Sequence, residues 1–184
     1  MKPHMTDSEI ELFKNNCLES DILLEWGSGA STIYFSSYVK EYYSIEHDAA
    51  WYDKIKKEIE IRNIKNVHYQ LITPTQQFSW SDYTRAKTTK VRDYKYPNQN
   101  FNNYVEYVHK LPCKKYDIVL VDGRARDYCL EEVIPFLTTD TKVFIHDYGY
   151  KNRLHYEKTA TKYYNVEKVV DHLALLKIKE GEIK

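Results

Sequence analysis

The chain has 184 residues, of which 42% are apolar and 15% aromatic, a composition that excludes a disordered protein and suits one globular domain. Its 27 Lys and Arg residues balance its 27 Asp and Glu residues, so its net charge favours neither nucleic acid nor an anionic membrane as a partner. The apolar runs are too short to span a membrane, and residues 1–10 lack the apolar core of a signal peptide.

The N-terminal part of the chain shows a helical pattern followed by a buried strand. Apolar spacing predicts a helix over residues 6–19, which Thr6 or Asp7 caps. The short apolar run at residues 22–24 predicts a strand that is buried on both faces. Residues 31–38 then predict a short helix.

The next three elements repeat the same alternation. Residues 41–46 and 66–72 predict strands, and both follow the β-branched and aromatic pattern of a sheet. Between them a helix begins at Asp48 and carries an apolar residue at every fourth position from Trp51 to Ile59.

Residues 73–103 show no sustained periodicity and predict an insertion or lid. Five Lys and Arg residues lie between positions 85 and 95, with tyrosines among and beside them. Basic and aromatic side chains together suit single-stranded nucleic acid or sugar rings. A solvated polar loop explains the same composition equally well.

The second half of the chain resumes the alternation of strands and helices. Residues 104–111 predict a short helix, and residues 116–122 predict the clearest buried strand after the first. Residues 127–137 predict a helix, residues 141–147 a strand, and residues 152–163 a helix.

Two strand patterns close the chain, at residues 164–170 and 173–179. Only Asp171 and His172 join them, which predicts an antiparallel hairpin. The whole pattern predicts a single α/β domain over residues 1–184, with a doubly wound, mostly parallel seven-stranded sheet, one reversed edge strand and helices on both faces.

Acidic residues and glycines follow the predicted strands, where such sheets bind ligands. Gly27 and Gly29 follow the first strand, and we expect both to permit positive φ and close approach of a ligand. A dinucleotide site would have a third glycine where Thr32 stands, although Glu46 lies at a suitable distance for a ribose contact. The dinucleotide interpretation is therefore disfavoured.

Four segments together resemble class I S-adenosylmethionine (SAM)-dependent methyltransferases. Glu25–Thr32 is similar to their first motif, Ser44–Asp48 to the second, Tyr116–Arg126 to the fourth and Val143–Asp147 to the fifth strand. The resemblance spans about residues 22–147, and it implies a Rossmann-like fold. The residues of the first and fourth motifs are similar to those of small stand-alone methyltransferases associated with glycan modification.

The resemblance assigns the first loop to the amino-acid end of SAM. Gly27 and Gly29 would leave bare backbone for the methionine chain, and Glu25 would accept a hydrogen bond from its amino group. Ser31 and Thr32 would bind its carboxylate at the start of a helix.

The resemblance assigns the end of the second strand to the nucleoside part of SAM. Glu46 would accept hydrogen bonds from the ribose hydroxyls, and His47 or Trp51 would flank the adenine. The helical spacing of Trp51 supports an alternative, in which its side chain is part of the core only.

Asp122, His146 and Asp147 are the candidate catalytic residues at two neighbouring strand ends. His146 is the natural general base because its reference pKa lies near neutrality. Asp122 and Asp147 resemble the acids with which some O-methyltransferases hold a divalent cation such as Mg²⁺, but Tyr148 stands where a third ligand is usual. Alternation along a regular strand would prevent His146 and Asp147 from facing one crevice.

Arg124 and Tyr148 are candidates for binding the methyl acceptor. Arg124 and Arg126 would clamp a phosphate or carboxylate of the acceptor, or would simply pair with Asp127 and Glu131.

These features predict a methyltransferase that modifies a sugar hydroxyl of a glycan or another small acceptor. The alternatives are a nucleic-acid methyltransferase that uses the basic insertion and a cofactor-binding subunit without turnover. Neither a nucleic-acid nor a membrane partner is favoured, and an oligomer is compatible with the sequence. Three cysteines without a CxxC pair indicate a reducing compartment, so we expect a cytoplasmic protein.

Overall fold

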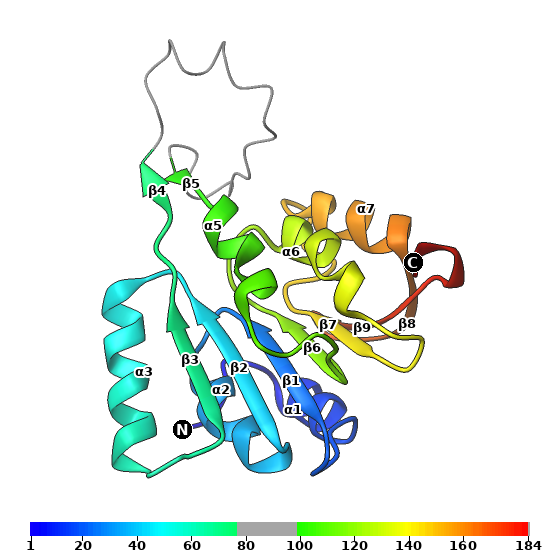
Figure 1. Ribbon diagram of the computed structural model, residues 1–184. Helices are drawn as coiled ribbons and strands as arrows, with labels where there is room; N and C mark the ends of the chain where they lie inside the picture. Colours follow the sequence, from blue (N-terminus) through cyan, green and yellow to red (C-terminus); the bar gives the residue numbers. More distant parts are fainter. Residues whose placement is uncertain (77–98, 184) are drawn as a thin grey trace.

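Apolar runs of the sequence form a seven-stranded sheet at the centre of the protein (Figure 1). The computed structural model describes residues 1–76 and 99–183. The strands are β1 (Ile22–Trp26), β2 (Glu41–Glu46), β3 (Val67–Leu71), β6 (Ile118–Val121), β7 (Lys142–Ile145), β8 (Tyr164–Val170) and β9 (Leu173–Ile178). Their order is β3-β2-β1-β6-β7-β9-β8, and the first five in this order are parallel. The predicted doubly wound, mostly parallel sheet is confirmed.

The closing hairpin is confirmed, but the expected place of its reversed strand is wrong. β9 is antiparallel to both of its neighbours and lies between β7 and β8, so the edge strand is β8. Five of the six residues of β9 are buried, whereas five of the seven residues of β8 are exposed. The more apolar strand therefore takes the inner position, and Asp171, with φ of 49°, turns the chain between them.

Helices cover both faces of the sheet, as predicted. One face carries α1 (Asp7–Lys14), α2 (Ala30–Phe35) and α3 (Ala49–Ile61), and the other carries α5 (Asn102–Val105), α6 (Arg126–Glu132) and α7 (Leu154–Tyr163). Short 3₁₀ turns extend several of them, namely η1 (Ser36–Tyr38), η2 (Glu106–Lys110), η3 (Ile134–Phe136) and η4 (Glu180–Glu182).

Side chains at alternate positions of the central strands pack into two separate apolar layers, one on each face of the sheet. Trp26 of β1 lies in the layer beneath α5, α6 and α7, whereas Leu23 lies in the layer beneath α1 and α2. In the second layer the ring of Phe13 lies 4.4 Å from that of Phe35 and 4.7 Å from that of Phe144. Burial of each such ring contributes roughly 1.5–3 kcal/mol, so these layers fix the strand ends on which the site stands.

Capping residues set the helix starts as the sequence predicted. Thr6 forms a capping box with Glu9 at α1, and the side chain of Asp48 accepts from the backbone N–H of Trp51 at α3. The first helix ends at Lys14 rather than at residue 19. Asn16 donates from its side chain to the carbonyl of Leu12 at 2.9 Å, a local bond that competes with continuation of the helix.

The expected insertion is described only at its two ends. β4 (Thr75–Gln76) pairs with β5 (Gln99–Asn100) in an antiparallel ladder, and α5 begins directly afterwards. The basic and aromatic side chains predicted to form a lid lie outside the described residues. Within the described part of the chain, no helix combines the length and the apolarity needed to cross a membrane.

Candidate functional site

A cleft of about 320 Å³ lies beyond the carboxyl ends of β1, β2 and β6, where the two halves of the sheet diverge. Its lining consists of Gly27, Ser28, Glu46, His47, Asp48, Trp51, Asp122, Gly123 and Arg124. Six of these were candidate site residues from sequence, while Ser28, Asp48 and Gly123 were not. All three lie inside the motifs, and Asp48 also caps the helix after the second strand.

Two glycines let the loops after β1 and β6 touch each other. Gly27 has φ of 91°, and a Cβ atom there would lie 2.3 Å from the Cα and N atoms of Gly123. Gly27 adopts the positive φ that glycine permits, whereas Gly29, with φ of 175°, has extended backbone. A Cβ on Gly29 would meet its nearest atoms, in Ser31 and Trp51, at ordinary distances of 3.8 Å.

Glu25 lies behind the glycine loop in a closed network of hydroxyl groups. Its two carboxylate oxygens accept from Ser31 Oγ and Thr32 Oγ1 at 2.6 Å each, and from Ser44 Oγ at 2.7 Å. Burial raises the pKa of Glu25 to about 7, although these hydroxyls act in the opposite direction. Glu25, Ser31 and Thr32 brace the loop and do not line the cleft, so their direct contact with a cofactor stays a prediction.

Glu46 presents a carboxylate to the cleft, and groups of the chain itself already donate hydrogen bonds to this carboxylate. One oxygen accepts from the backbone N–H groups of His47 and Asp48, and the other accepts from the N–H and hydroxyl of Ser28, all at 2.8–2.9 Å. Burial would raise the pKa of Glu46, but His47 and these donors hold it below its ordinary value. The Ser28 hydroxyl lies 2.5 Å from the hydroxyl of Tyr69, so it has a second partner.

Trp51 lies at the surface of the cleft rather than in the core. Its side chain is 40% exposed, whereas Ile55 on the same helical face is fully buried. The indole Nε1 donates to the carbonyl of Ser28 at 2.7 Å, which ties α3 to the glycine loop. The core-only interpretation of Trp51 is therefore wrong.

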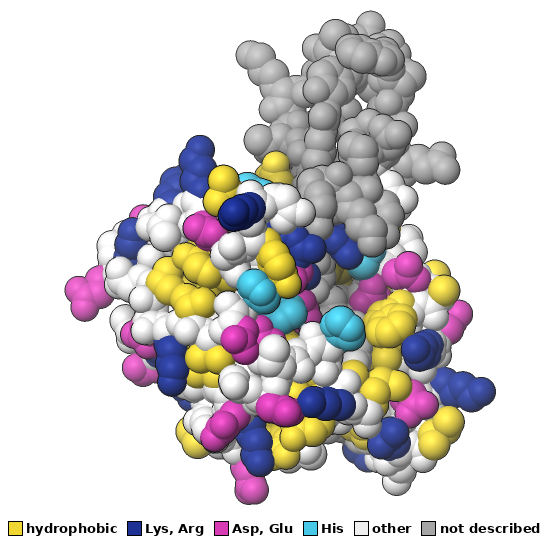
Figure 2. Space-filling model, turned by 180° about the vertical axis from the view of Figure 1, so that it is seen from behind, with side chains coloured by type: hydrophobic (Ala, Val, Ile, Leu, Met, Phe, Trp, Pro, Cys, Tyr) yellow, Lys and Arg dark blue, Asp and Glu magenta, His cyan; other side chains and the backbone are white. Residues whose placement is uncertain are grey.

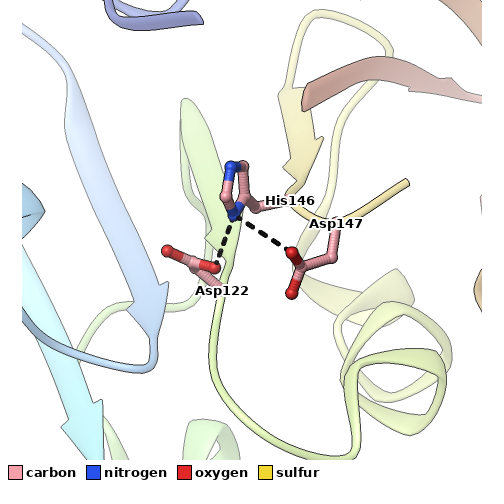
Figure 3. Close-up of side chains that lie close together, drawn as sticks. All are labelled: Asp122, His146 and Asp147. Carbon is pink, nitrogen blue, oxygen red and sulfur yellow. Dashed lines mark hydrogen bonds and ion pairs between the residues drawn. The ribbon is translucent and has the colours of Figure 1, made fainter. Parts of the chain in front are cut away.

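Asp122, His146 and Asp147 come together at the ends of β6 and β7 (Figure 3). His146 Nδ1 lies 3.1 Å from Asp122 Oδ1 and 3.9 Å from Asp147 Oδ1. β7 ends at Ile145, and Asp147 has φ of 63°, so the regular alternation of side chains stops before this pair. The turn lets both residues face Asp122, which a continuing strand would have prevented.

The environment of His146 stabilises its charged form. Burial would lower the pKa of His146, but its hydrogen bond to the Asp122 carboxylate and the charge of that group raise it. Burial would raise the pKa of Asp122, but Arg126 and His146 hold it below its usual value. His146 Nε2 also lies 3.5 Å from a carboxylate oxygen of Glu9 in the first turn of α1, a contact that the sequence did not indicate.

Arg126 is buried and bonds to the site itself, so neither of its predicted roles is correct. It forms ion pairs with Asp122 at 3.2 Å and Asp147 at 2.7 Å, rather than with Asp127 or Glu131, and it is 4% exposed. A side chain so buried does not reach an acceptor in the cleft.

The two candidates for acceptor binding lie in different places. Arg124 lines the cleft beside Asp122, as its predicted role requires. Tyr148 does not line the cleft, and its backbone N–H donates to the carbonyl of His172 at 2.9 Å. The acceptor contact of Tyr148 stays a prediction.

Asp122, His146 and Asp147 offer suitable ligand atoms for a metal ion, but arginines beside the two carboxylates already balance their charge. One ligand atom from each of Asp122, His146 and Asp147 lies within 4.8 Å of the others. The two carboxylates, however, already pair with the guanidinium groups of Arg126 and Arg153, and His146 Nδ1 is directed at Asp122. The residues present do not fit a divalent cation.

A scan of protein-family models and a search of curated proteins found no match to this chain. Among solved structures, a methyltransferase-like protein from Silicibacter pomeroyi is similar, with 21% identity and a TM-score of 0.70, over 97% of this chain and 88% of that one. A candidate methyltransferase from Streptococcus mutans in complex with SAH has 12% identity and a TM-score of 0.62, over 95% and 100%. An rRNA methylase from Streptococcus thermophilus has 11% identity and a TM-score of 0.59, over 95% and 99%. The chain shares the fold of these proteins over almost its whole length.

Proposed function

We propose that this protein is a SAM-dependent methyltransferase. The observation that carries the proposal is the cleft in which the bare backbone of Gly27 and the carboxylate of Glu46 face each other at the switch point of the sheet. The four sequence motifs and the shared fold support it, as does SAH, the demethylated product of SAM, in the similar Streptococcus mutans structure.

The residues of the cleft suit such a cofactor. Gly27 and Gly123, where the two loops touch, have no side chain that would cover the methionine part. Glu46 would bind the ribose hydroxyls once the Ser28 hydroxyl turns to Tyr69, which frees one acceptor position on the carboxylate oxygen that still accepts from the Ser28 N–H. Trp51 and His47 border the space for the base, and Ser31, Thr32 and Glu25 hold the loop from behind.

SAM supplies a methyl group on a sulfonium, so the protein has to align the acceptor and take its proton. The acceptor oxygen would take the methyl group as the carbon–sulfur bond breaks with its electron pair kept on sulfur, and the hydroxyl proton would pass to Asp122. Asp122 borders the cleft and is the nearest of the three cluster residues to an acceptor placed there. His146 stands behind Asp122, and its neutral form would receive the proton through that carboxylate.

We infer that the acceptor is a sugar hydroxyl of a glycan, on the basis of the motif resemblance. The alternative acceptor is RNA, which the rRNA methylase among the similar structures favours. On the face seen in Figure 2, the acidic and basic side chains are interspersed around several histidines that gather near its middle, and the described residues of this face form no continuous basic patch of the kind that binds nucleic acid.

Transfer of labelled methyl from SAM to a panel of oligosaccharides and to ribosomal RNA tests the acceptor. We expect label on an oligosaccharide that base treatment does not release, as for an ether, and Asp122→Asn should abolish it. Label found on RNA alone would refute the glycan acceptor but keep the methyltransferase. Binding of SAH without label on either acceptor class would support the cofactor-binding subunit instead.

A further inference from the structure

We propose that Arg126, together with Arg153, supplies the positive charge between Asp122 and Asp147 that a divalent metal ion would otherwise supply, so this cluster works without a metal. Arg126 is then a positioning residue, because it acts on the cleft only through the groups that it holds.

Arg126 contacts both strand ends at once. Its Nε donates to the carbonyl of Gly123, and one terminal nitrogen donates to the carbonyl of Asp122, both at 3.0 Å. The other terminal nitrogen donates to the carbonyl of His146. The nitrogen that binds the Asp122 carbonyl also lies 3.2 Å from Asp122 Oδ1 and 2.7 Å from Asp147 Oδ2. One planar guanidinium thus fixes the ends of β6 and β7, which a lysine could not do.

Local structure places the guanidinium of Arg126 beside both Asp122 and Asp147. It is the first residue of α6, and the preceding Ala125 has φ of 50°, so the chain turns sharply into the helix. The guanidinium carbon lies 5.7 Å from the ring centroid of Tyr156, which covers its outer side. With 4% of its surface exposed, the cation is held in place rather than swinging into solvent.

The charges of this cluster balance one another without a metal ion. Asp122 and Asp147 contribute two negative charges, which Arg126 and Arg153 offset, and the charged form of His146 faces the carboxylate of Glu9. A divalent ion would add two uncompensated charges at a half-buried position, where water screens them poorly. His146 Nδ1 is directed at Asp122, so this nitrogen already has a partner within the cluster.

Titration of the protein with Mn²⁺, followed by electron paramagnetic resonance, tests this proposal with neither cofactor nor acceptor present. Its outcome therefore does not depend on methyl transfer. We expect the wild-type protein to leave millimolar Mn²⁺ free. Arg126→Met combined with Arg153→Met should gain one Mn²⁺ per chain, with affinity at least about tenfold above wild type. Asp147→Asn added to this double variant should remove the gained site.

Arg126→Lys is the matched control, because it keeps a cation beside the carboxylates and should gain no Mn²⁺. Wild-type protein that binds one Mn²⁺ per chain and loses it in Asp147→Asn would overturn the proposal, and that comparison needs no folded Arg126 variant. A double variant that folds, by circular dichroism, but gains no Mn²⁺ site would overturn it as well.

Discussion

Replacement of Gly27 by alanine should separate the two loops that form the cleft. Its φ of 91° is costly for any residue with a side chain, and the added Cβ would lie 2.3 Å from backbone atoms of Gly123. A left-handed backbone costs about 1–2 kcal/mol and overpacking about 1–3 kcal/mol, so the free energy of unfolding should fall by roughly 2–5 kcal/mol. Urea unfolding followed by circular dichroism measures this loss.

Gly29→Ala is the matched control two residues away in the same loop. Its extended backbone and 3.8 Å contacts accept a methyl group, so the free energy of unfolding should stay the same or rise by about 0.4–1 kcal/mol. Losses for the two variants that agree within about 0.5 kcal/mol would refute the claim that the Gly27–Gly123 contact shapes the cleft.

Three further predictions concern buried acids and their partners. The pKa of Glu25 is about 7 in the fold against 4.5 without it, so the free energy of unfolding should fall, by on the order of 3 kcal/mol, as pH rises from about 4.5 to 7. Urea unfolding of Glu25→Gln across this pH range should show a free energy of unfolding that depends less on pH. A pH dependence equal to that of wild type would contradict the raised pKa of Glu25. The Asp122 carboxylate raises the pKa of His146, so NMR titration should place that pKa above 6.5 and Asp122→Asn should lower it. A pKa of His146 that is the same in Asp122→Asn would exclude Asp122 as the cause of the shift. Ser28→Ala removes one donor from Glu46, so calorimetry should show SAH affinity about fivefold higher, since a hydrogen bond contributes about 1 kcal/mol; a weaker affinity would show that Ser28 binds the ligand itself.

The sheet could be predicted because its signals are local. Each buried strand is a continuous apolar run, and the acid or glycine after it marks the end of the strand. Glu46 and Asp122 could therefore be assigned to one crevice from their places at strand ends, and both line the cleft. The order of β8 and β9 was missed because it depends on which of two adjacent strands buries more surface.

The roles of side chains within the cluster could not be read from the sequence. Arg126 bonds to the carbonyl of His146, 20 residues away, and no spacing rule indicates that contact. The joint orientation of His146 and Asp147 depends on one positive φ at a residue other than glycine, which propensity disfavours. Similarly, Trp51 lies in a regular helical stripe, and only the position of the loop beside it shows that its indole faces the cleft.

Calorimetric titration with SAH tests the central claim most directly. The wild-type protein should bind one SAH per chain, and Glu46→Gln should weaken binding by about tenfold or more, which corresponds to at least about 1.4 kcal/mol. Glu41→Gln, the same change at the other end of β2, should leave the affinity unchanged. Absence of heat with wild-type protein at millimolar SAH would contradict the proposed methyltransferase function, and equal affinities for the two variants would contradict the contact of Glu46 with the ribose.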